Sequence, residues 1–515
     1  IDETGKVNSH SYVTMGVQGI NMHVGVWGST RMGKTTLIMS LVGQFISKGI
    51  NPILMVPSKG FEYDMLMHLF PDIRVFTCGR ADVSNLVYNP WNPPDGVRLT
   101  KWVDRVVEVW TLWMPNERVI SMHVDDVVYK VYEICNWDLE ENKKGRPILL
   151  EDVVAAVNIV CESLPYGDEV NSNIKGALIS RIKSILRKPS LVKMFNTRTG
   201  LTISELMAHP TIIRMDDLSE NDKILVMGLL TAAVSEYKLA NPSTQVTNIL
   251  VLEEAHYLLG RSDLTGEANS AVRLQAVNAL IEMLRVLGGT GLGVILVDQL
   301  PSELVPKAVK IPVNTVVFAL THEEDKELAG KRARCTDSQI DHISGMKVGE
   351  AVVFLQREGA PQNVMILPLD KLIGNEQPVD LTGDQAIRNH MQPIFDQYPE
   401  LHSSEPLPDG LLNQLLTRKT DSSKQWFERI SLEFRRQIEG TVQSRKFKEY
   451  CKKLIAKEDI SALMKLIQKT SDVSGDGSYI SSLYVLDQMV KCYRNPENQP
   501  VFDKMGLEVD EAKPT

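Results

Sequence analysis

The sequence lacks the marks of several protein classes. Its six cysteines form no Cys-x-x-Cys pair and show no histidine spacing for zinc, so we expect the reduced thiols of a cytoplasmic protein rather than disulfides. It has no excess of positive charge, since 56 lysine and arginine residues against 65 aspartate and glutamate residues give a net charge of −9. Bulk charge therefore does not predict nucleic-acid binding, and any contact with DNA requires a local basic strip.

Signals for membrane insertion and secretion are missing too, and no internal repeat is evident. No apolar run approaches the roughly 20 residues of a transmembrane helix, and no signal-peptide pattern opens the sequence, so we expect no membrane partner. The first residue is Ile1 rather than methionine, which suggests a portion of a longer polypeptide. With 515 residues, 43% of them hydrophobic and 23% charged, we expect a globular protein of two or more structural units.

The most specific feature present is a phosphate-binding loop, or P-loop. The run from Gly28 to Thr36 matches G-x-x-x-x-G-K-[ST] and lies between a predicted strand and a predicted helix. The glycines let backbone N–H groups surround a polyphosphate, Lys34 can reach the β- and γ-phosphates, and the Thr35 hydroxyl can ligate Mg²⁺. The helix dipole favours negative charge at the same place. We predict a nucleoside triphosphate site whose loop residues are Gly28, Ser29, Thr30, Arg31, Met32, Gly33, Lys34, Thr35 and Thr36.

A second half of this site follows the predicted strand at residues 248–252. Glu253 and Glu254 come directly after this apolar run, as in a Walker B element. We expect Glu253 to reach the metal and Glu254 to orient and polarise the water that attacks the γ-phosphate. A helix that begins with acidic residues is the alternative, but the P-loop in the same chain favours the catalytic pair. For His256 we expect a structural hydrogen bond and no catalytic role.

Further candidates surround the next predicted strand, residues 293–297. Gln299 follows this strand at the crevice that holds the phosphates, where it could sense the γ-phosphate or hold the attacking water. An ordinary turn residue before a proline fits that position equally well. Arg273 and Arg285 lie on the helix before this strand, and we choose Arg285 as the arginine that completes a neighbouring subunit's site. A surface salt bridge is the commoner role for either arginine.

Strands that alternate with helices predict an α/β fold with a mainly parallel sheet covered on both faces. The apolar runs are continuous rather than alternating, as in strands buried on both faces. One sheet is expected from both ends of the first 370 residues, with strands at 23–27, 52–56, 73–77, 211–215, 248–252, 293–297, 315–319 and 351–355.

Between residues 97 and 205 the periodicity is mostly helical. Trp102, Trp110 and Trp113 recur at helical offsets, a stripe more typical of packed core than of a ligand platform. The basic tract at 418–469 is more typical of a solvated helix face than of a nucleic-acid contact. The expected parts are a lead-in (1–14), the P-loop half of the core (15–96), a helical insertion (97–205), the Walker B half (206–375), a linker (376–408) and a C-terminal helical region with a polar tail (409–515).

As a set, these motifs resemble the HerA/FtsK superfamily of P-loop ATPases, and specifically its HerA branch. The likeness covers about residues 15–370, although the turn at Pro57 lacks the acidic residue common in that family. The matching segments are residues 28–36, 57–63, 89–90, 177–182, 251–259, 291–302 and 349–352.

The resemblance implies a RecA-like core that binds ATP and Mg²⁺ and assembles into a homo-hexamer with ATP sites shared between neighbours. It further implies translocation on double-stranded DNA together with a nuclease or another effector, in DNA end processing or in bacterial antiviral defence. Two alternatives stay open. One is a platform that uses ATP to assemble and license an effector without translocation, and the other is a conjugation- or secretion-type ATPase.

Overall fold

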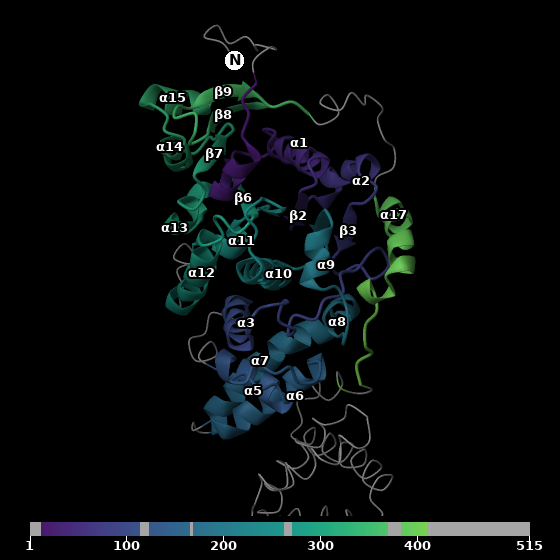
Figure 1. The fold of residues 1–515 in the computed structure, drawn as a ribbon. Helices are drawn as coiled ribbons and strands as arrows, with labels where there is room; N and C mark the ends of the chain where they lie inside the picture. Colours follow the sequence, from purple (N-terminus) through teal and green to yellow (C-terminus); the bar gives the residue numbers. More distant parts are fainter. Residues whose placement is uncertain are drawn as a thin grey trace, which may run out of the picture. The chain divides into compact units, whose positions relative to one another are not determined.

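The computed structural model describes residues 12–113, 123–164, 168–261, 270–368, 383–408 and 411. The chain divides into two compact units, one of residues 1–125 and 188–406 and the other of residues 126–187 and 407–515. The first unit contains the sheet (Figure 1). The expected C-terminal helical region lies, except for Leu411, outside the described residues.

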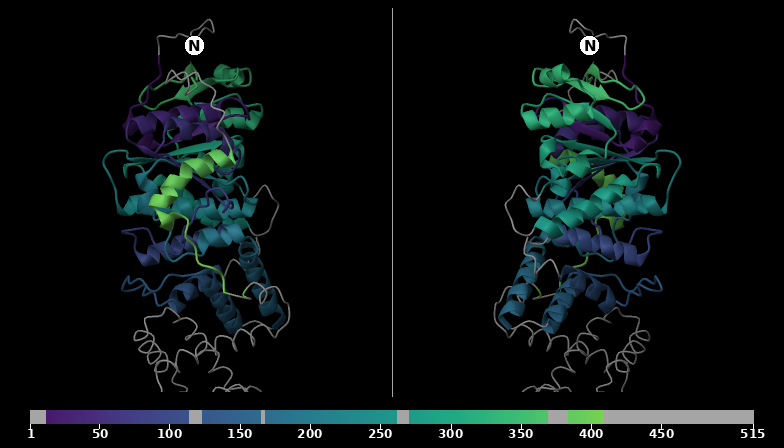
Figure 2. Two further views of the ribbon diagram at one scale, coloured as in Figure 1. Left: turned by 90° about the vertical axis from the view of Figure 1, so that its right-hand side faces the viewer. Right: turned by 90° about the vertical axis from the view of Figure 1, so that its left-hand side faces the viewer.

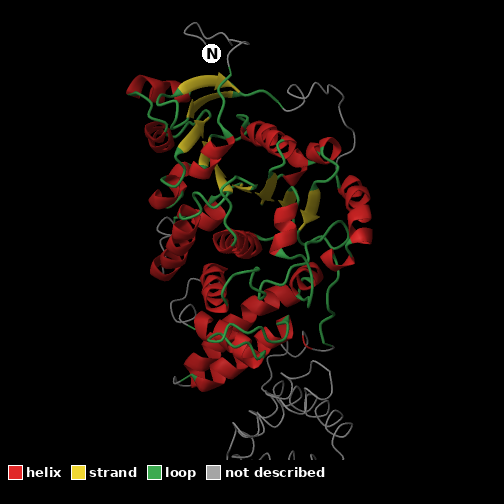
Figure 3. Ribbon diagram, in the orientation of Figure 1, coloured by secondary structure: helices red, strands yellow, loops and turns green. Residues whose placement is uncertain are grey.

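The sheet of the first unit has the strand order β3-β4-β2-β5-β6-β1-β7-β8-β9 among the described residues. Neighbours from β3 to β7 pair in parallel, and β8 and β9 are antiparallel additions at one edge. The predicted α/β class with a mainly parallel sheet is confirmed (Figure 3). The strands are β1 (Val24–Trp27), β2 (Asn51–Val56), β3 (Arg74–Thr77), β4 (Thr211–Arg214), β5 (Asn248–Leu252), β6 (Leu292–Asp298), β7 (Asn314–Val317), β8 (Glu350–Phe354) and β9 (Gln362–Met365).

Helices cover both faces of this sheet, which explains the continuous apolar strands. Helix α1 (Lys34–Ser47) lies on one face and α10 (Glu220–Ala240) on the other (Figure 1). Helix α3 (Leu99–Trp113) packs on α10 from outside. The tryptophans of α3 are at most 4% exposed, so the expected core role of this stripe is confirmed. The remaining elements of the unit are η1 (Val17–Met22), η2 (Gly60–Tyr63), α2 (Met65–Leu69), α8 (Pro189–Phe195), α9 (Ile203–Ala208), α11 (His256–Leu259), α12 (Ser270–Arg285), η4 (Pro301–Glu303), α13 (Pro306–Val309), α14 (Glu323–Arg332), α15 (Asp337–Ile343), α17 (Asp384–Gln397) and η5 (Pro399–Leu401).

The helical insertion is shorter as a compact unit than the sequence predicts. The second unit takes only residues 126–187 from the predicted range of 97–205. It holds most of α5 (Val124–Ile134), together with α6 (Leu150–Ser163) and α7 (Asp168–Leu186), which pack on each other. Helix α3 belongs to the first unit because its apolar stripe is buried there. No helix in the described ranges combines the length and apolar character that crossing a membrane requires.

The predicted linker at 376–408 contains a packed helix instead. Helix α17 contacts the edge strand β3 and runs along one side of the first unit (Figure 2). Ile387, Met391 and Phe395 recur every fourth residue and are buried, and Pro393 is accommodated inside the helix. The linker prediction is wrong for residues 384–397, because the proline and acidic residues there hide a narrow apolar stripe with helical spacing.

A buried histidine at the entrance to β1 makes the stability of the first unit depend on pH. His23 is 3% exposed, and burial lowers its pKa from 6.5 to about 4. Between these values the unfolded chain binds the proton and the folded chain does not, so the free energy of unfolding falls as the pH falls. The loss amounts to about 3 kcal/mol, because one pKa unit corresponds to about 1.4 kcal/mol.

We therefore expect His23→Gln to lose this part of the pH dependence. Urea denaturation at pH 7 and pH 5 measures it, and His342→Gln, a substitution of an exposed histidine, is the matched control that keeps the wild-type slope. An equal slope in His23→Gln and the wild type would contradict the assignment.

Candidate nucleotide-binding site

The P-loop connects the end of β1 to the start of α1, as its sequence predicts. Gly33 has φ 114°, a conformation that favours glycine. A Cβ on Gly28 would lie 2.5 Å from Cβ of Phe318, so the close packing of the loop also requires glycine there. The N–H groups of Gly28 and Ser29 donate to the carbonyls of Asp298 (3.3 Å) and Ala319 (2.8 Å). The loop is thereby attached to the ends of the two strands that flank β1.

Lys34 lies across this loop. Its Nζ donates to the carbonyl oxygens of Gly28 (2.6 Å) and Ser29 (3.0 Å). Burial lowers its pKa, although the nearby carboxylates of Glu254 and Glu253 oppose the shift. No side-chain cap satisfies the first N–H groups of α1. A cation and free amide hydrogens at a helix start form an environment that fits a phosphate group.

The Walker B carboxylates reach the same edge of the sheet because β6 lies between β1 and β5. Trp27 of β1 pairs with Asp298 of β6, and Leu252 of β5 pairs with Leu296 of β6. Glu254, two residues beyond Leu252, has φ 48°, a left-handed conformation uncommon outside glycine. Such strained positions cluster at functional sites.

Gln299 and His256 both contact the Walker B turn. Gln299 Nε2 donates to Glu254 Oε1 at 2.5 Å. His256 Nδ1 lies 3.1 Å from Asp298 Oδ2 and 3.6 Å from Glu254 Oε2, and its backbone N–H donates to Asp298 Oδ2 at 2.8 Å. Burial opposes the charged form of His256, but the Asp298 and Glu254 carboxylates prevail and raise its pKa. The structure thus brings together Glu254, Gln299 and His256.

Two residues at the site were missed from the sequence. Glu62 and Tyr63 lie on η2, which follows the turn after β2. Thr35 Oγ1 donates to Glu62 Oε2 at 2.7 Å, and the Tyr63 hydroxyl donates to Glu253 Oε1. The turn at Pro57 itself has no acidic residue, but the segment that follows it supplies Glu62. In the sequence, the only sign of Glu62 and Tyr63 was their place in residues 57–63, a segment that resembles the HerA branch.

These contacts form an oxygen-rich cluster that fits Mg²⁺. Burial raises the pKa of Glu253 to about 7, and Glu254 adds to the rise, whereas the hydrogen bond from Tyr63 and the charge of Lys34 oppose it. A divalent cation would favour the ionised form of such a carboxyl group. Thr35, Glu62 and Glu253 supply the hard oxygen ligands that Mg²⁺ prefers.

Arg285 is not brought to this cluster within its own chain. It is the last residue of α12, which is followed by the start of β6, so it lies at the opposite edge of the sheet from the P-loop. Its side chain is 71% exposed and lies 3.5 Å from Glu282. A role of Arg285 in a neighbouring subunit stays a prediction. Arg273 lies near the other end of α12.

Comparisons with known proteins identify the fold. No family model matches the sequence, and no curated protein matches it. Among solved structures, the bacterial conjugative coupling protein TrwBdeltaN70 is similar with a TM-score of 0.50 and 12% identity, over 68% of this chain and 87% of that chain. The plasmid coupling protein TrwB in complex with ADP and Mg²⁺ has a TM-score of 0.50 and 12% identity, over 69% and 88%. VirB4 of Thermoanaerobacter pseudethanolicus has a TM-score of 0.49 and 14% identity, over 69% and 91%.

The two TrwB structures support the RecA-like P-loop fold predicted from the sequence. The likeness covers more than four-fifths of their length, so it extends beyond the P-loop. At 12% identity it establishes the fold alone, and the chemistry rests on the residues described above.

Removing the Tyr63 hydroxyl should change the pH at which the site takes up metal. The hydrogen bond from Tyr63 stabilises ionised Glu253, so Tyr63→Phe should raise the pKa of Glu253 above its value of about 7. Binding of a non-hydrolysable ATP analogue at subsaturating Mg²⁺ should rise with pH through about 7 in the wild type and at higher pH in the variant.

The control is Tyr88→Phe, because Tyr88 is buried and its hydroxyl has no hydrogen-bond partner among the described residues. Titrations of Mg²⁺ at several pH values test the shift. Coincident profiles for Tyr63→Phe and the wild type would refute the link between Tyr63 and Glu253.

Proposed function

We propose that this chain is an ATP-hydrolysing motor of the HerA type, a homo-hexameric ring that translocates on double-stranded DNA with a nuclease or defence effector. One observation carries the proposal. Lys34, Thr35, Glu253 and Glu254 converge at one edge of the sheet. That set combines a phosphate cradle, metal ligands and a catalytic carboxylate, which are the parts that phosphoryl transfer to water needs.

Binding of ATP would begin at the P-loop. Lys34 exchanges its loop carbonyl partners for phosphate oxygens, and the first N–H groups of α1 hold the same group. Thr35, Glu62 and Glu253 would hold Mg²⁺, which neutralises phosphate charge when bound. Glu253 must be ionised to do this, so its raised pKa couples metal uptake to proton release.

Glu254 would act as the general base for the attacking water. Its carboxylate is half-buried, and Gln299 holds one oxygen while His256 lies beside the other. A carboxylate that is already oriented needs little reorganisation to accept a proton from water. In this proposal Gln299 acts chiefly by aiming Glu254, a narrower role than direct sensing of the γ-phosphate.

The ring, the DNA and the effector in this proposal rest on resemblance to other proteins. The motifs across residues 15–370 resemble the HerA branch. Similarity to a coupling protein solved with ADP and Mg²⁺ supports the nucleotide and the metal. The same similarity favours a second candidate, a coupling ATPase of bacterial conjugation.

Two substitutions separate binding from hydrolysis. Lys34→Ala should abolish binding of ATP and Mg²⁺, whereas Glu254→Gln should keep binding and lose hydrolysis by about 10²- to 10⁴-fold, the usual contribution of a general base. Equilibrium binding of a fluorescent ATP analogue and phosphate-release assays measure the two effects. Lys48→Ala, an exposed residue after the same helix, is the control. Wild-type hydrolysis by Glu254→Gln would reject the assignment of the base.

A DNA motor should hydrolyse ATP faster on DNA. We expect duplex DNA to raise the rate, and the DNA concentration that gives half the effect should increase with salt, because phosphate contacts release counterions. Hydrolysis measured across a salt series, with native mass measurement of the assembly, tests this. A rate that is independent of DNA at every salt concentration would favour the alternative of an assembly platform without translocation. In that case the Glu254→Gln variant should still activate the effector when ATP is bound.

A further inference from the structure

We propose that helix α17 is a positioning element of the nucleotide site. Docked on β3, it stabilises a network of ion pairs that fixes η2, the short helix that carries Glu62 and Tyr63 to the P-loop and the Walker B strand. The inference rests on the proposed function, since it concerns the binding of ATP and Mg²⁺. It adds residues far from the phosphates to the machinery of the site.

The η2 turn needs support from outside. It has only four residues, too few for a helix to be stable by itself. It begins after Lys59, whose φ of 55° is a strained left-handed conformation for a lysine. Glu62 and Tyr63 can keep their contacts to Thr35 and Glu253 only while this turn stays in place.

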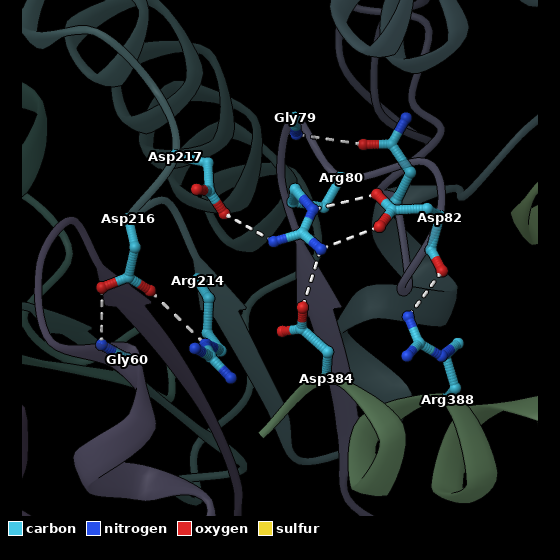
Figure 4. Close-up of polar contacts among 10 residues, drawn as sticks. Gly60, Gly79, Arg80, Asp82, Arg214, Asp216, Asp217, Asp384 and Arg388 are labelled. Carbon is cyan, nitrogen blue, oxygen red and sulfur yellow. Dashed lines mark hydrogen bonds and ion pairs between the residues drawn. The ribbon is translucent and has the colours of Figure 1, made fainter.

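Arg214, the last residue of β4, joins the two ends of the turn. At one end, the Gly60 N–H donates to Asp216 Oδ1 at 2.9 Å, and Arg214 Nε lies 3.4 Å from Asp216 Oδ2 (Figure 4). A Cβ on Gly60 would lie 2.5 Å from Arg214 Nε, so the turn rests directly on this pair. At the other end, Arg214 Nη1 donates at 3.1 Å to Asp64, the residue after Tyr63. The Arg214 and Asp64 side chains are 9% and 1% exposed.

The start of α17 completes this network. The Gly383 N–H donates at 3.1 Å to Asp64 Oδ2, the oxygen that Arg214 does not use. Asp384 Oδ2 lies 2.7 Å from Arg80 Nη2, and Arg80 Nη1 lies 3.5 Å from Asp217 (Figure 4). Gly383 therefore contacts the end of the η2 turn, and Asp384 contacts Arg80 in the loop after β3, which in turn contacts the loop after β4.

The burial of these contacts indicates which one links the docking of α17 to the position of η2. The side chains around Arg80 are 31–63% exposed, so each of those ion pairs contributes little. The buried carboxylate of Asp64 is different, because it depends on every hydrogen bond it receives. Apolar contacts of Ile387 and Met391 hold α17 in place. Release of α17 would leave one oxygen of Asp64 without the Gly383 amide.

The test is a double variant, Ile387→Ala with Met391→Ala, that weakens docking of α17 without touching the site. Hydrogen exchange of residues 383–397 establishes the release, and the affinity for a non-hydrolysable ATP analogue with Mg²⁺ is then measured. We expect affinity to fall about five- to tenfold, at the low end of typical coupling between sites. Because coupling is reciprocal, the Mg²⁺-bound analogue should slow exchange of α17 in the wild type by a similar factor.

Three further variants complete the design. Asn389→Ala changes the exposed face of α17 and should behave as wild type. Asp384→Ala removes the Arg80 ion pair but keeps the apolar contacts, so it should weaken binding in the same direction by a smaller factor even if the double variant fails to fold. Lys34→Ala should abolish binding.

Unchanged affinity in the released and Asp384→Ala variants, with α17 exchange indifferent to nucleotide, would overturn the inference. The proposed function would survive that result as long as Lys34→Ala abolishes binding. If neither the wild type nor Lys34→Ala binds the ATP analogue with Mg²⁺, the proposed function is wrong, and the inference is wrong with it.

Discussion

The site depends on one strand, β6, which lies between the P-loop strand and the Walker B strand. Its last residue, Asp298, connects both neighbours: its carbonyl accepts the Gly28 N–H of the P-loop, and its carboxylate accepts the His256 N–H after the Walker B turn. The same carboxylate accepts the N–H of Gln299, which turns toward Glu254. A buried acid satisfied by backbone amides thus fixes the separation of the phosphate cradle from the catalytic carboxylate.

The sequence pattern predicted where the strands lie along the chain, but it did not predict their order in the sheet. Continuous apolar runs located β1 to β8 to within two residues at each end, because strands buried on both faces carry an unambiguous signal. Strand β9 was missed because its residues are half-buried or exposed and no apolar run marks it. The insertion of β6 between β1 and β5 joins segments about 270 residues apart, and neither local pattern contains that pairing.

The same distinction applies to the site. Lys34, Thr35 and the Walker B carboxylates were predictable because each motif encodes its geometry within a few residues. Glu62 and Tyr63 were not, because their contacts depend on a short turn whose position is set by Arg214, more than 150 residues away. Burial, together with the nearby carboxylates of Glu254 and Glu62, explains the high pKa of Glu253. Like charges and burial destabilise the ionised carboxyl until a cation arrives, which is typical of a functional site rather than of a stable core.

Helix α17 shows why composition was a poor guide to the segment before residue 408. An edge strand such as β3 exposes backbone groups that must be covered. The side chains of α17 cover them, since the Val75 N–H lies 3.1 Å from Met391 Sδ and the Ile73 carbonyl lies 2.5 Å from His390 Nε2. Docking of this helix therefore gives partners to two backbone groups at the edge of the sheet. The hydrogen bond from Gly383, the residue before the helix, to Asp64 then links docking to the nucleotide site.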